Sequence, residues 1–285
     1  MPHTHLISAA ELQALAHGGT PLMVFDCSFD LTNPERGISD YHAAHIPGAV
    51  YAHLDRDLSS AGGPSASGGR HPLPTRERFS AWLASVGFAN GMQAVAYDRN
   101  GSMPCMRLWW LFKWLGHDAA AVLNGGFAAW QAAGGATAQD EEMPRAPGHF
   151  APGEPLRTLV DAARVLAHLE QPDQTLMDAR AAERFRGEVE PLDPVAGHIP
   201  GALNRPWMDN LTADGHFKSA AQLRAEFAAV LQGCEPASVV HQCGSGVSAI
   251  HNLLAMELAG YPQGALYAGS WSEWCDDASR PVAVG

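Results

Sequence analysis

The chain has 285 residues, with 18 Lys and Arg against 30 Asp and Glu, so its formal net charge is −12 at pH 7. Hydrophobic residues make up 46% of the chain and charged residues 17%, a balance typical of globular proteins with buried cores. The acidic balance argues against nucleic acid or an anionic membrane as a partner, because both attract basic surfaces. The length predicts about two domains.

The cysteines are five in number and irregularly spaced, and no two of them form a Cys-x-x-Cys pair. This pattern argues against a disulfide framework or a structural zinc site, and it favours reduced thiols in the cytoplasm. The 14 histidines form no metal-binding motif, so we expect no metal site. No apolar run approaches the length of a membrane-spanning helix, and residues 1–18 lack the pattern of a signal peptide.

The first half of the chain predicts an alternation of strands and helices. Leu22–Asp26 predicts a strand that ends in an acidic residue, and the turn sequence His45–Ala49 (His-Ile-Pro-Gly-Ala) follows a helical stretch. Gln93–Tyr97 predicts the next strand, followed by the loop Asp98–Cys105. The glycine- and tryptophan-containing segment Gly125–Trp130 closes this half.

The second half repeats this order. A strand at Leu176–Asp178 precedes a second His-Ile-Pro-Gly-Ala turn at His198–Ala202, and Ser238–Gln242 corresponds to Gln93–Tyr97. Ala268–Trp274 corresponds to Gly125–Trp130. Alternating strands and helices predict an α/β fold of two tandem domains, each a mainly parallel sheet flanked by helices on both faces.

The domain boundaries follow from the repeat and from a proline-rich stretch. We expect domain 1 at residues 1–140, a linker at 141–155 and domain 2 at 156–285. The repeats lie 153 residues apart at the turn (198 − 45) and 144 apart at the closing tryptophan (274 − 130). The glycine- and serine-rich segment Ser59–Gly69 is the expected place of the extra residues in the first copy.

The stretch Val239–Ser248 places a cysteine at a junction between a strand and a helix. An apolar run leads to Cys243, and Val247–Leu258 has apolar residues at helical spacing. Gly244 and Gly246 allow the backbone to curl around a bound group, whose charge the loop N–H groups and the helix N-terminus would stabilise. Such a loop favours the nucleophilic thiolate; the alternative is a buried cysteine at an ordinary glycine turn.

The two copies differ at this loop. Tyr97-Asp98-Arg99 stands where the second half has Gln242-Cys243-Gly244, so the first copy lacks the nucleophile. Cys105 lies further along its loop, after Pro104, and we expect it to pack rather than react. A single active site in domain 2 is therefore predicted, with wall residues from domain 1. Cysteine-dependent phosphatases share the junction but need an arginine at the position of Ala249, which argues against that class.

Three motifs together resemble one family. The paired His-Ile-Pro-Gly-Ala turns, the loop Cys243–Ser248 and the closing segment Gly269–Trp274 are similar, in this order, to those of tandem-domain rhodanese-like sulfurtransferases. The resemblance covers nearly the whole chain. It implies two rhodanese-like domains, of which the first is catalytically silent and the second has a cysteine that forms a persulfide.

Within the family, the Cys-Gly-Ser-Gly-Val loop resembles the 3-mercaptopyruvate sulfurtransferase branch, whereas the thiosulfate branch has cationic residues after the cysteine. Ser248 stands where threonine is usual and keeps the hydroxyl group. The resemblance implies substrate-binding roles for the loop residues Gly244, Gly246, Val247 and Ser248.

The resemblance also identifies Arg184 as the residue that holds the anionic donor, a role suited to a guanidinium fork. The branch often has a second arginine, but here Asp193 stands at the matching position, and Arg186 is the expected substitute. Ser245, His71 and Asp55 correspond to a relay that moves protons near the cysteine, because a carboxylate orients the imidazole and tunes its proton affinity.

These residues imply a two-step transfer through a persulfide on Cys243, for which no metal or organic cofactor is expected. The expected donors are 3-mercaptopyruvate and thiosulfate, and the expected acceptors are a thiol, such as a small thiol or thioredoxin, and cyanide. Two alternatives remain open: thiosulfate:cyanide sulfurtransferase as the main activity, and a non-catalytic persulfide carrier or sensor.

Overall fold

The computed structural model describes residues 1–140 and 142–285. Residue 141, the first residue of the expected linker, lies outside the described residues. The chain forms two compact units. The first contains Met1–Pro64, Pro74–Leu156 and Ala213–His216, and the second contains Ser65–Leu73, Arg157–Thr212 and Phe217–Gly285. The segment that precedes and includes His71 therefore packs with the second half of the chain.

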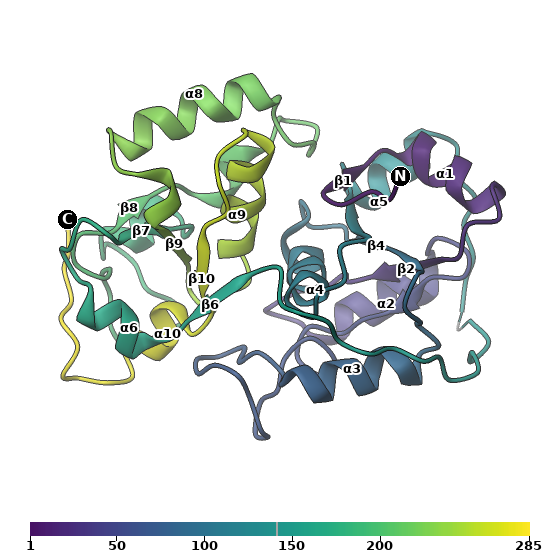
Figure 1. Cartoon of the computed structure of the whole chain (residues 1–285), viewed down its shortest axis with the longest axis horizontal. Helices are drawn as coiled ribbons and strands as arrows, with labels where there is room; N and C mark the ends of the chain where they lie inside the picture. The colour runs from purple at the N-terminus through teal and green to yellow at the C-terminus, as the bar shows by residue number, and fades with distance from the viewer. Residues whose placement is uncertain (141) are drawn as a thin grey trace. The chain divides into compact units, whose positions relative to one another are not determined.

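The first unit is built on a five-stranded parallel sheet in the order β1-β5-β4-β2-β3 (Figure 1). Its strands are β1 (Leu6–Ile7), β2 (Leu22–Asp26), β3 (Val50–Tyr51), β4 (Gln93–Tyr97) and β5 (Ala120–Leu123). Its helices are α1 (Ala9–His17), α2 (Glu35–Ala43), α3 (Arg76–Ser85), α4 (Met103–Trp114) and α5 (Gly126–Ala132).

The second unit repeats the architecture, with a parallel sheet in the order β6-β10-β9-β7-β8. Its strands are β6 (Thr158–Val160), β7 (Thr175–Asp178), β8 (Leu203–Asn204), β9 (Val239–Gln242) and β10 (Ala265–Tyr267). Its helices are α6 (Ala162–Ala167), α7 (Ala182–Phe185), α8 (Ala220–Leu231), α9 (Ala249–Leu258) and α10 (Ser270–Trp274), with short 3-10 turns η1 (Trp207–Asn210) and η2 (Pro236–Ser238).

Both faces of each sheet are buried. Along β2, Val24 packs with α1 and α5, whereas its neighbour Phe25 contacts Phe88 and Phe112 on the other face. Along β9, Val240 packs with the tryptophans of α10, and α8 and α9 lie on the opposite face. Strands buried on both sides read as continuous apolar runs. The predicted α/β class and the flanking of each parallel sheet by helices are confirmed.

The repeated His-Ile-Pro-Gly-Ala turn has a structural role in both units. His45 stacks on Tyr41 at a ring-centroid distance of 4.0 Å and hydrogen-bonds its carbonyl oxygen through Nδ1 at 2.8 Å. His198 does the same with Phe185, at 3.8 Å and 2.8 Å. The histidine thus ties the turn to the preceding helix, and in the second unit it holds the four-residue α7 in place.

Several short elements have no counterpart in the sequence-based prediction. The pairs β1–α1 and β6–α6, which open the two units, were not predicted, nor were the two-residue strands β3 and β8 at the opposite sheet edges. Strands of two or three residues give no readable alternation, and edge position makes them still less distinctive. The strands Leu22–Asp26 and Gln93–Tyr97 and the strand ending at Gln242 are confirmed. The helix expected from Val247 begins at Ala249.

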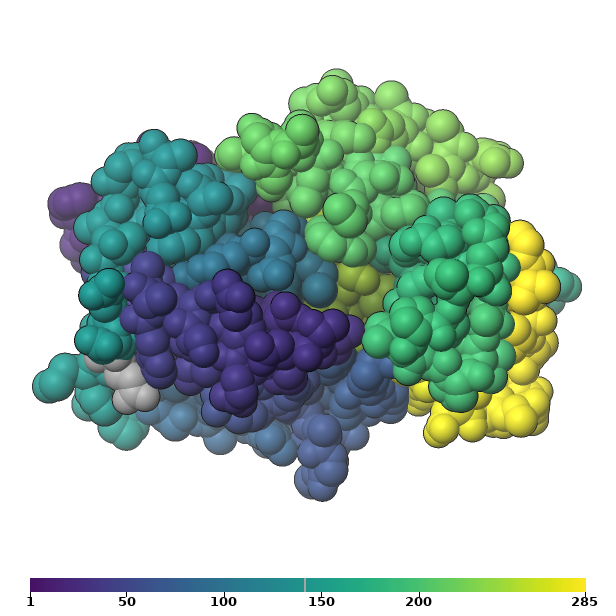
Figure 2. Space-filling view, turned by 180° about the vertical axis from the view of Figure 1, so that it is seen from behind, coloured from purple at the N-terminus to yellow at the C-terminus, as the bar shows by residue number. Residues whose placement is uncertain are grey.

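The C-terminal residues of the second unit pack against the segment that follows α7. Ala283 forms an antiparallel bridge with His198, and the N–H of Gly285 donates to the carbonyl oxygen of Arg186 at 3.0 Å. The space-filling view shows the C-terminal residues (yellow) beside this green surface (Figure 2).

No helix in the described part of the chain is long and apolar enough to cross a bilayer.

The buried side chain of His241, in the middle of β9, makes the stability of the fold depend on pH. Its side chain is 0% exposed, and burial lowers its pKa from 6.5 to about 3. Neither ring nitrogen has a hydrogen-bond partner among the described residues. The neutral imidazole is therefore the folded form. Above pH 6.5 protonation of His241 does not lower the free energy of unfolding. Below that value the free energy of unfolding falls by about 1.4 kcal/mol for each pH unit, down to the pKa of the folded state.

We expect His241→Leu to remove this loss. The quantity to compare is the free energy of unfolding of the variant minus that of the wild type. This difference should be larger by about 2 kcal/mol at pH 5 than at pH 7.5. Urea unfolding at the two pH values measures this. His149→Leu, at an exposed position, is the control. An equal pH dependence in His241→Leu and wild type would contradict the assignment.

Candidate active site

The cysteine loop begins where the central strand β9 ends. Cys243 follows Gln242 directly and is 2% exposed. Its Sγ accepts a hydrogen bond from the backbone N–H of Gly246 at 3.1 Å. α9 starts at Ala249, so the positive end of a ten-residue helix lies behind the loop. A negative charge on the sulfur can therefore be stabilised by a hydrogen bond from the backbone of the loop.

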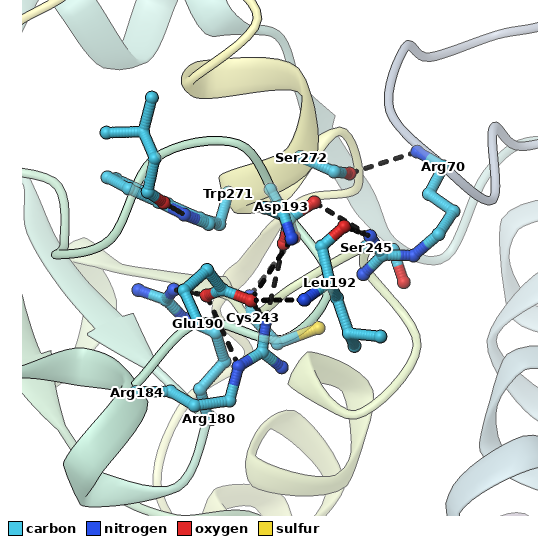
Figure 3. Close-up of polar contacts among 12 residues, drawn as sticks. Arg70, Arg180, Arg184, Glu190, Leu192, Asp193, Cys243, Ser245, Trp271 and Ser272 are labelled. Carbon is cyan, nitrogen blue, oxygen red and sulfur yellow. Dashed lines mark hydrogen bonds and ion pairs between the residues drawn. The ribbon is translucent and has the colours of Figure 1, made fainter. Parts of the chain in front are cut away.

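The closing motif Gly269–Trp274 holds the backbone of this loop. The N–H groups of Trp271 and Ser272 donate to the carbonyl oxygens of Cys243 and Gly244 at 3.0 and 2.9 Å. The N–H of Cys243 donates to Oγ of Ser270 at 3.1 Å. Figure 3 shows Trp271 and Ser272 next to the cysteine loop. These bonds account for the presence of both motifs in one sequence, since the second positions the first.

The loop glycines have different roles. Gly246 has φ of +74°, and a Cβ there would lie 2.1 Å from the carbonyl oxygen of Ala268, so only glycine fits. Gly244 has no positive φ, and a Cβ there would lie in ordinary contact with Arg70 and Arg184, at 3.5 and 3.6 Å. The absence of a side chain at Gly244 therefore leaves open the space between the cysteine loop and two guanidinium groups.

The remaining loop residues continue into the helix. Val247 is 4% exposed and packs in the interior, and Ser248 is the residue before the first turn of α9, with no side-chain capping bond. The predicted binding roles of Val247 and Ser248 remain predictions.

Ser245 and His71 come together. Nδ1 of His71 lies 2.7 Å from Oγ of Ser245, and both side chains are buried. His71 lies in the segment Ser65–Leu73, which packs with the second unit although it is remote in sequence. Asp55, the third predicted member of the relay, is half-buried in the first unit, and its N–H donates to Nδ1 of His53 at 3.1 Å. The part of Asp55 in a relay remains a prediction.

Arg184 lies beside the loop, on the short helix α7. Its Nη2 contacts Oε1 of Glu190 at 2.6 Å and Oδ2 of Asp193 at 3.3 Å, and its Nε contacts Oε2 of Glu190 at 3.3 Å. Glu190 also accepts the N–H groups of Leu192 and Asp193 at 3.0 and 3.2 Å. Figure 3 shows these acidic side chains grouped around the guanidinium. The arginine is thereby held in one orientation.

Arg186 is placed differently from Arg184. Its side chain is 44% exposed, and its guanidinium pairs with Glu188 through two contacts of 2.7 and 2.9 Å. Such exposed pairs hold a side chain weakly. The structure therefore brings Arg184, and not Arg186, next to Gly244.

A second charged group, Arg180, is buried below the site. Its guanidinium binds both oxygens of Asp178 and lies 4.8 Å from the ring centroid of Trp271. Burial lowers the pKa of Arg180, but the carboxylates of Asp178 and Glu190 outweigh it and raise the pKa above its ordinary value. The first unit has a similar pair, in which Arg99 contacts Asp26 at 2.8 Å.

The corresponding loop of the first unit has a carboxyl group in place of the thiol. Asp26 pairs with Tyr97 as Asp178 pairs with Gln242, so Asp98 is equivalent to Cys243. The carboxyl of Asp98 accepts N–H groups of Asn100, Ser102 and Cys105 at 2.8, 2.9 and 3.0 Å. Main-chain donors of this loop thus converge on one acidic side chain.

The thiols of the first unit are packed. Cys27 and Cys105 are fully buried, and burial raises the pKa of each thiol well above its ordinary value. The expectation that Cys105 packs agrees with this placement. In the part of the chain that the structure describes, no group of three or more His, Cys, Asp or Glu could hold a metal ion.

Sequence reasoning missed Arg70, Arg180 and Glu190. Arg70 directly precedes His71, and its side chain contacts Asp193 at 2.7 Å. The signals were present but weak: Arg70 adjoins a predicted site residue, and Arg180 follows the acidic residue that ends β7. A charged residue in a turn is most often solvated, so neither position is distinctive without the fold.

Comparisons with known proteins agree with this arrangement. The model of the rhodanese-like domain matches residues 8–133 and 161–277, one match in each half of the chain. The chain belongs to the rhodanese-like family. The family resemblance inferred from the motifs is confirmed, and so is the presence of two such domains.

Relatives in this family match over all or most of the chain. A probable 3-mercaptopyruvate sulfurtransferase of Pseudomonas aeruginosa is 47% identical, with 100% of both chains covered. The thiosulfate sulfurtransferase of Mus musculus is 34% identical, over 90% of this chain and 86% of the relative. Among solved structures, 3-mercaptopyruvate sulfurtransferase from Leishmania major has a TM-score of 0.84 and 31% identity, over 99% of this chain and 77% of that one. Sulfur transfer is the reaction class that these names share, in agreement with the enzyme class predicted from the motifs.

Proposed function

We propose that this rhodanese-like chain is a sulfurtransferase that moves a sulfur atom from 3-mercaptopyruvate to a thiol or cyanide through a persulfide on Cys243. The observation that supports this most directly is the loop around Cys243, where the N–H of Gly246 donates to the sulfur and Arg184 lies beside Gly244. The names of the relatives support the same reaction class. Thiosulfate is the second candidate donor, because some relatives bear its name.

In the first step, the thiolate of Cys243 attacks the sulfur of 3-mercaptopyruvate. The new S–S bond forms as the C–S bond of the donor breaks, and the electron pair goes to the carbon. The proton of the donor's S–H group ends on that carbon, so the products are a persulfide anion and pyruvate. The donor carbon is reduced and the sulfur of the cysteine is oxidised.

The proton moves through groups that the chain supplies. Ser245 and His71, joined at 2.7 Å, can accept a proton from the donor thiol and return it to the leaving carbon. We include Asp55 as the residue that orients His71. Thiosulfate needs no such proton, since sulfite leaves as an anion, and the relay therefore favours the mercaptopyruvate reaction.

In the second step, the terminal sulfur passes to an acceptor. A thiolate, from a small thiol or thioredoxin, or cyanide attacks the outer sulfur, the S–S bond breaks, and Cys243 returns as a thiolate. The N–H of Gly246 and the helix N-terminus behind the loop stabilise both charged forms. The enzyme needs no cofactor in this scheme. The five cysteines are free thiols, which supports a reducing compartment such as the cytoplasm.

Mass spectrometry tests this proposal directly. We expect exposure of the full chain to 3-mercaptopyruvate, without acceptor, to add the mass of one sulfur atom to the peptide that contains Cys243. Addition of cyanide should remove that mass. A peptide that stays unmodified, while product pyruvate accumulates, would contradict the persulfide route.

A further inference from the structure

A cavity lies in the first unit, between α1, the His45–Ala49 turn and the end of α5. Its volume is about 440 Å³, within the range of about 300–1,000 Å³ that is typical of small-molecule sites. α1 and α5 cover the same face of the sheet, on which Val24 packs (Figure 1). No described residue of the second unit lines the cavity, so it has no part in the cysteine loop.

The floor of the cavity is apolar. Leu12, Ile46 and Trp130 line it, and all three belong to the buried core of this unit. The indole N–H of Trp130 donates to the carbonyl oxygen of Ala136 at 2.8 Å, so the one polar atom of this side chain is already bonded. The floor therefore favours a hydrocarbon or aromatic group, which gains free energy when it leaves water.

Small residues leave the mouth of the cavity open. Ala16, on α1, lines the cavity and is exposed to solvent. Gly134, which follows α5, also lines it, and a Cβ there would meet no atom within 4 Å. At these two points nothing larger than a methyl group stands between the apolar floor and solvent, so a small molecule can enter.

The ionisable side chains that line the cavity are basic. They are Arg145 and His17, and no Asp or Glu among the described residues lines it. The chain as a whole has 30 acidic and 18 basic residues, so this lining runs against its overall charge. A basic lining favours an anionic ligand over a cationic one.

Arg145 is held at the mouth by its own backbone neighbour. Its Nη2 donates to the carbonyl oxygen of Gly48 at 2.6 Å, and its Nε and Nη1 make no hydrogen bond to the described residues. Glu142 adds a negative charge nearby, but its carboxylate already accepts the N–H of Gly48 at 2.6 Å and contacts Nε2 of His45 at 3.2 Å. The guanidinium therefore keeps N–H groups with which to bind an anion.

We propose that this cavity binds a small carboxylic acid with an apolar tail. The tail lies on the floor formed by Leu12, Ile46 and Trp130, and the carboxylate accepts N–H groups of Arg145 at the mouth. Burial of the tail supplies affinity, and the charged hydrogen bonds select an acid over a neutral molecule of the same shape. The site is separate from the sulfur-transfer chemistry and does not depend on it.

The probe for this site is 3-phenylpropionate, which has an aromatic ring, a short chain and a carboxylate. We expect it to bind the full chain with a Kd of about 1 mM or lower, measured by titration with ligand-observed NMR. The alcohol 3-phenyl-1-propanol has the same ring and chain without the charge, and its Kd should be at least about tenfold higher. Equal affinities for acid and alcohol, or no binding of the acid at ten times that concentration, would overturn the proposal.

Two variants locate the bound probe. Ala16→Phe should fill the mouth and raise the Kd of the acid at least about tenfold, whereas Ala14→Phe, at an exposed position of the same helix that does not line the cavity, should leave it unchanged. Arg145→Met should raise the Kd of the acid by a similar factor and leave that of the alcohol within twofold. Unfolding curves check that each variant is folded.

The donor site of the second unit is the competing location, because it also takes a carboxylate in the proposed function. Arg184→Gln should therefore leave the Kd of 3-phenylpropionate unchanged, and Ala16→Phe should keep kcat/KM for 3-mercaptopyruvate within twofold. Binding that is lost in Arg184→Gln but kept in Ala16→Phe would place the probe beside the cysteine loop and overturn the proposal.

Discussion

Cys243→Ser is expected to abolish sulfur transfer from both donors while the fold stays intact. Serine is nearly the same size, and the backbone bonds of Cys243 to Ser270 and Trp271 do not involve the side chain. A hydroxyl group at neutral pH is not ionised and attacks sulfur poorly, so the first step has no nucleophile. Loss of a nucleophile on which all turnover depends lowers kcat by several orders of magnitude.

The measurement is pyruvate release from 3-mercaptopyruvate with cyanide or a thiol as acceptor, together with the unfolding curve of the variant. Cys234→Ser, at the exposed cysteine, is the matched control and should retain full activity. Substantial turnover in Cys243→Ser would show that another group receives the sulfur.

The second large effect is expected for His71→Asn. The amide oxygen of asparagine can accept a hydrogen bond from Ser245 in place of Nδ1, but an amide does not exchange protons near neutral pH. General acid–base catalysis contributes about 10²- to 10⁴-fold, so kcat/KM for 3-mercaptopyruvate should fall within that range. The thiosulfate reaction, in which sulfite leaves without a proton, should lose much less.

The comparison of donors separates a relay from a structural role. If His71 only supported the loop, both donors would lose activity equally, and that outcome would contradict the relay. Ser245→Ala is a useful partner, since the loss in the double variant should be less than the product of the two single losses when both residues act on one proton.

The sequence motifs predicted where several of the candidate site residues lie in the fold. Apolar periodicity in the sequence placed Cys243 between a strand and a helix, and in the structure it lies between β9 and α9. Alignment of the two halves of the sequence also identified Asp98 as the residue equivalent to Cys243. The positions of Ser245 and His71 followed from the family resemblance, and the structure brings these two side chains together.

What the sequence could not give is the packing of distant segments. Arg70 and Asp193 are 123 positions apart, and no local pattern indicates that they meet. Asp193 alone suggested a missing positive charge, and Arg186 was the nearest substitute in sequence. On α7 and just after it, however, Arg184 and Arg186 differ in surroundings: the first contacts two buried acids and the second an exposed one. Burial, rather than proximity along the chain, decides which arginine faces the loop.

The carboxyl of Asp98 has a consequence for what the loop of the first unit can bind. This carboxyl accepts hydrogen bonds from three backbone N–H groups of its own loop. The N–H groups that could bind an anion in the first unit are therefore already bonded to a side chain of the same loop. Nothing that diffuses in has to fill that loop, and nothing has to leave it. A free anion would have to displace this covalently attached carboxyl group in order to bind in the loop.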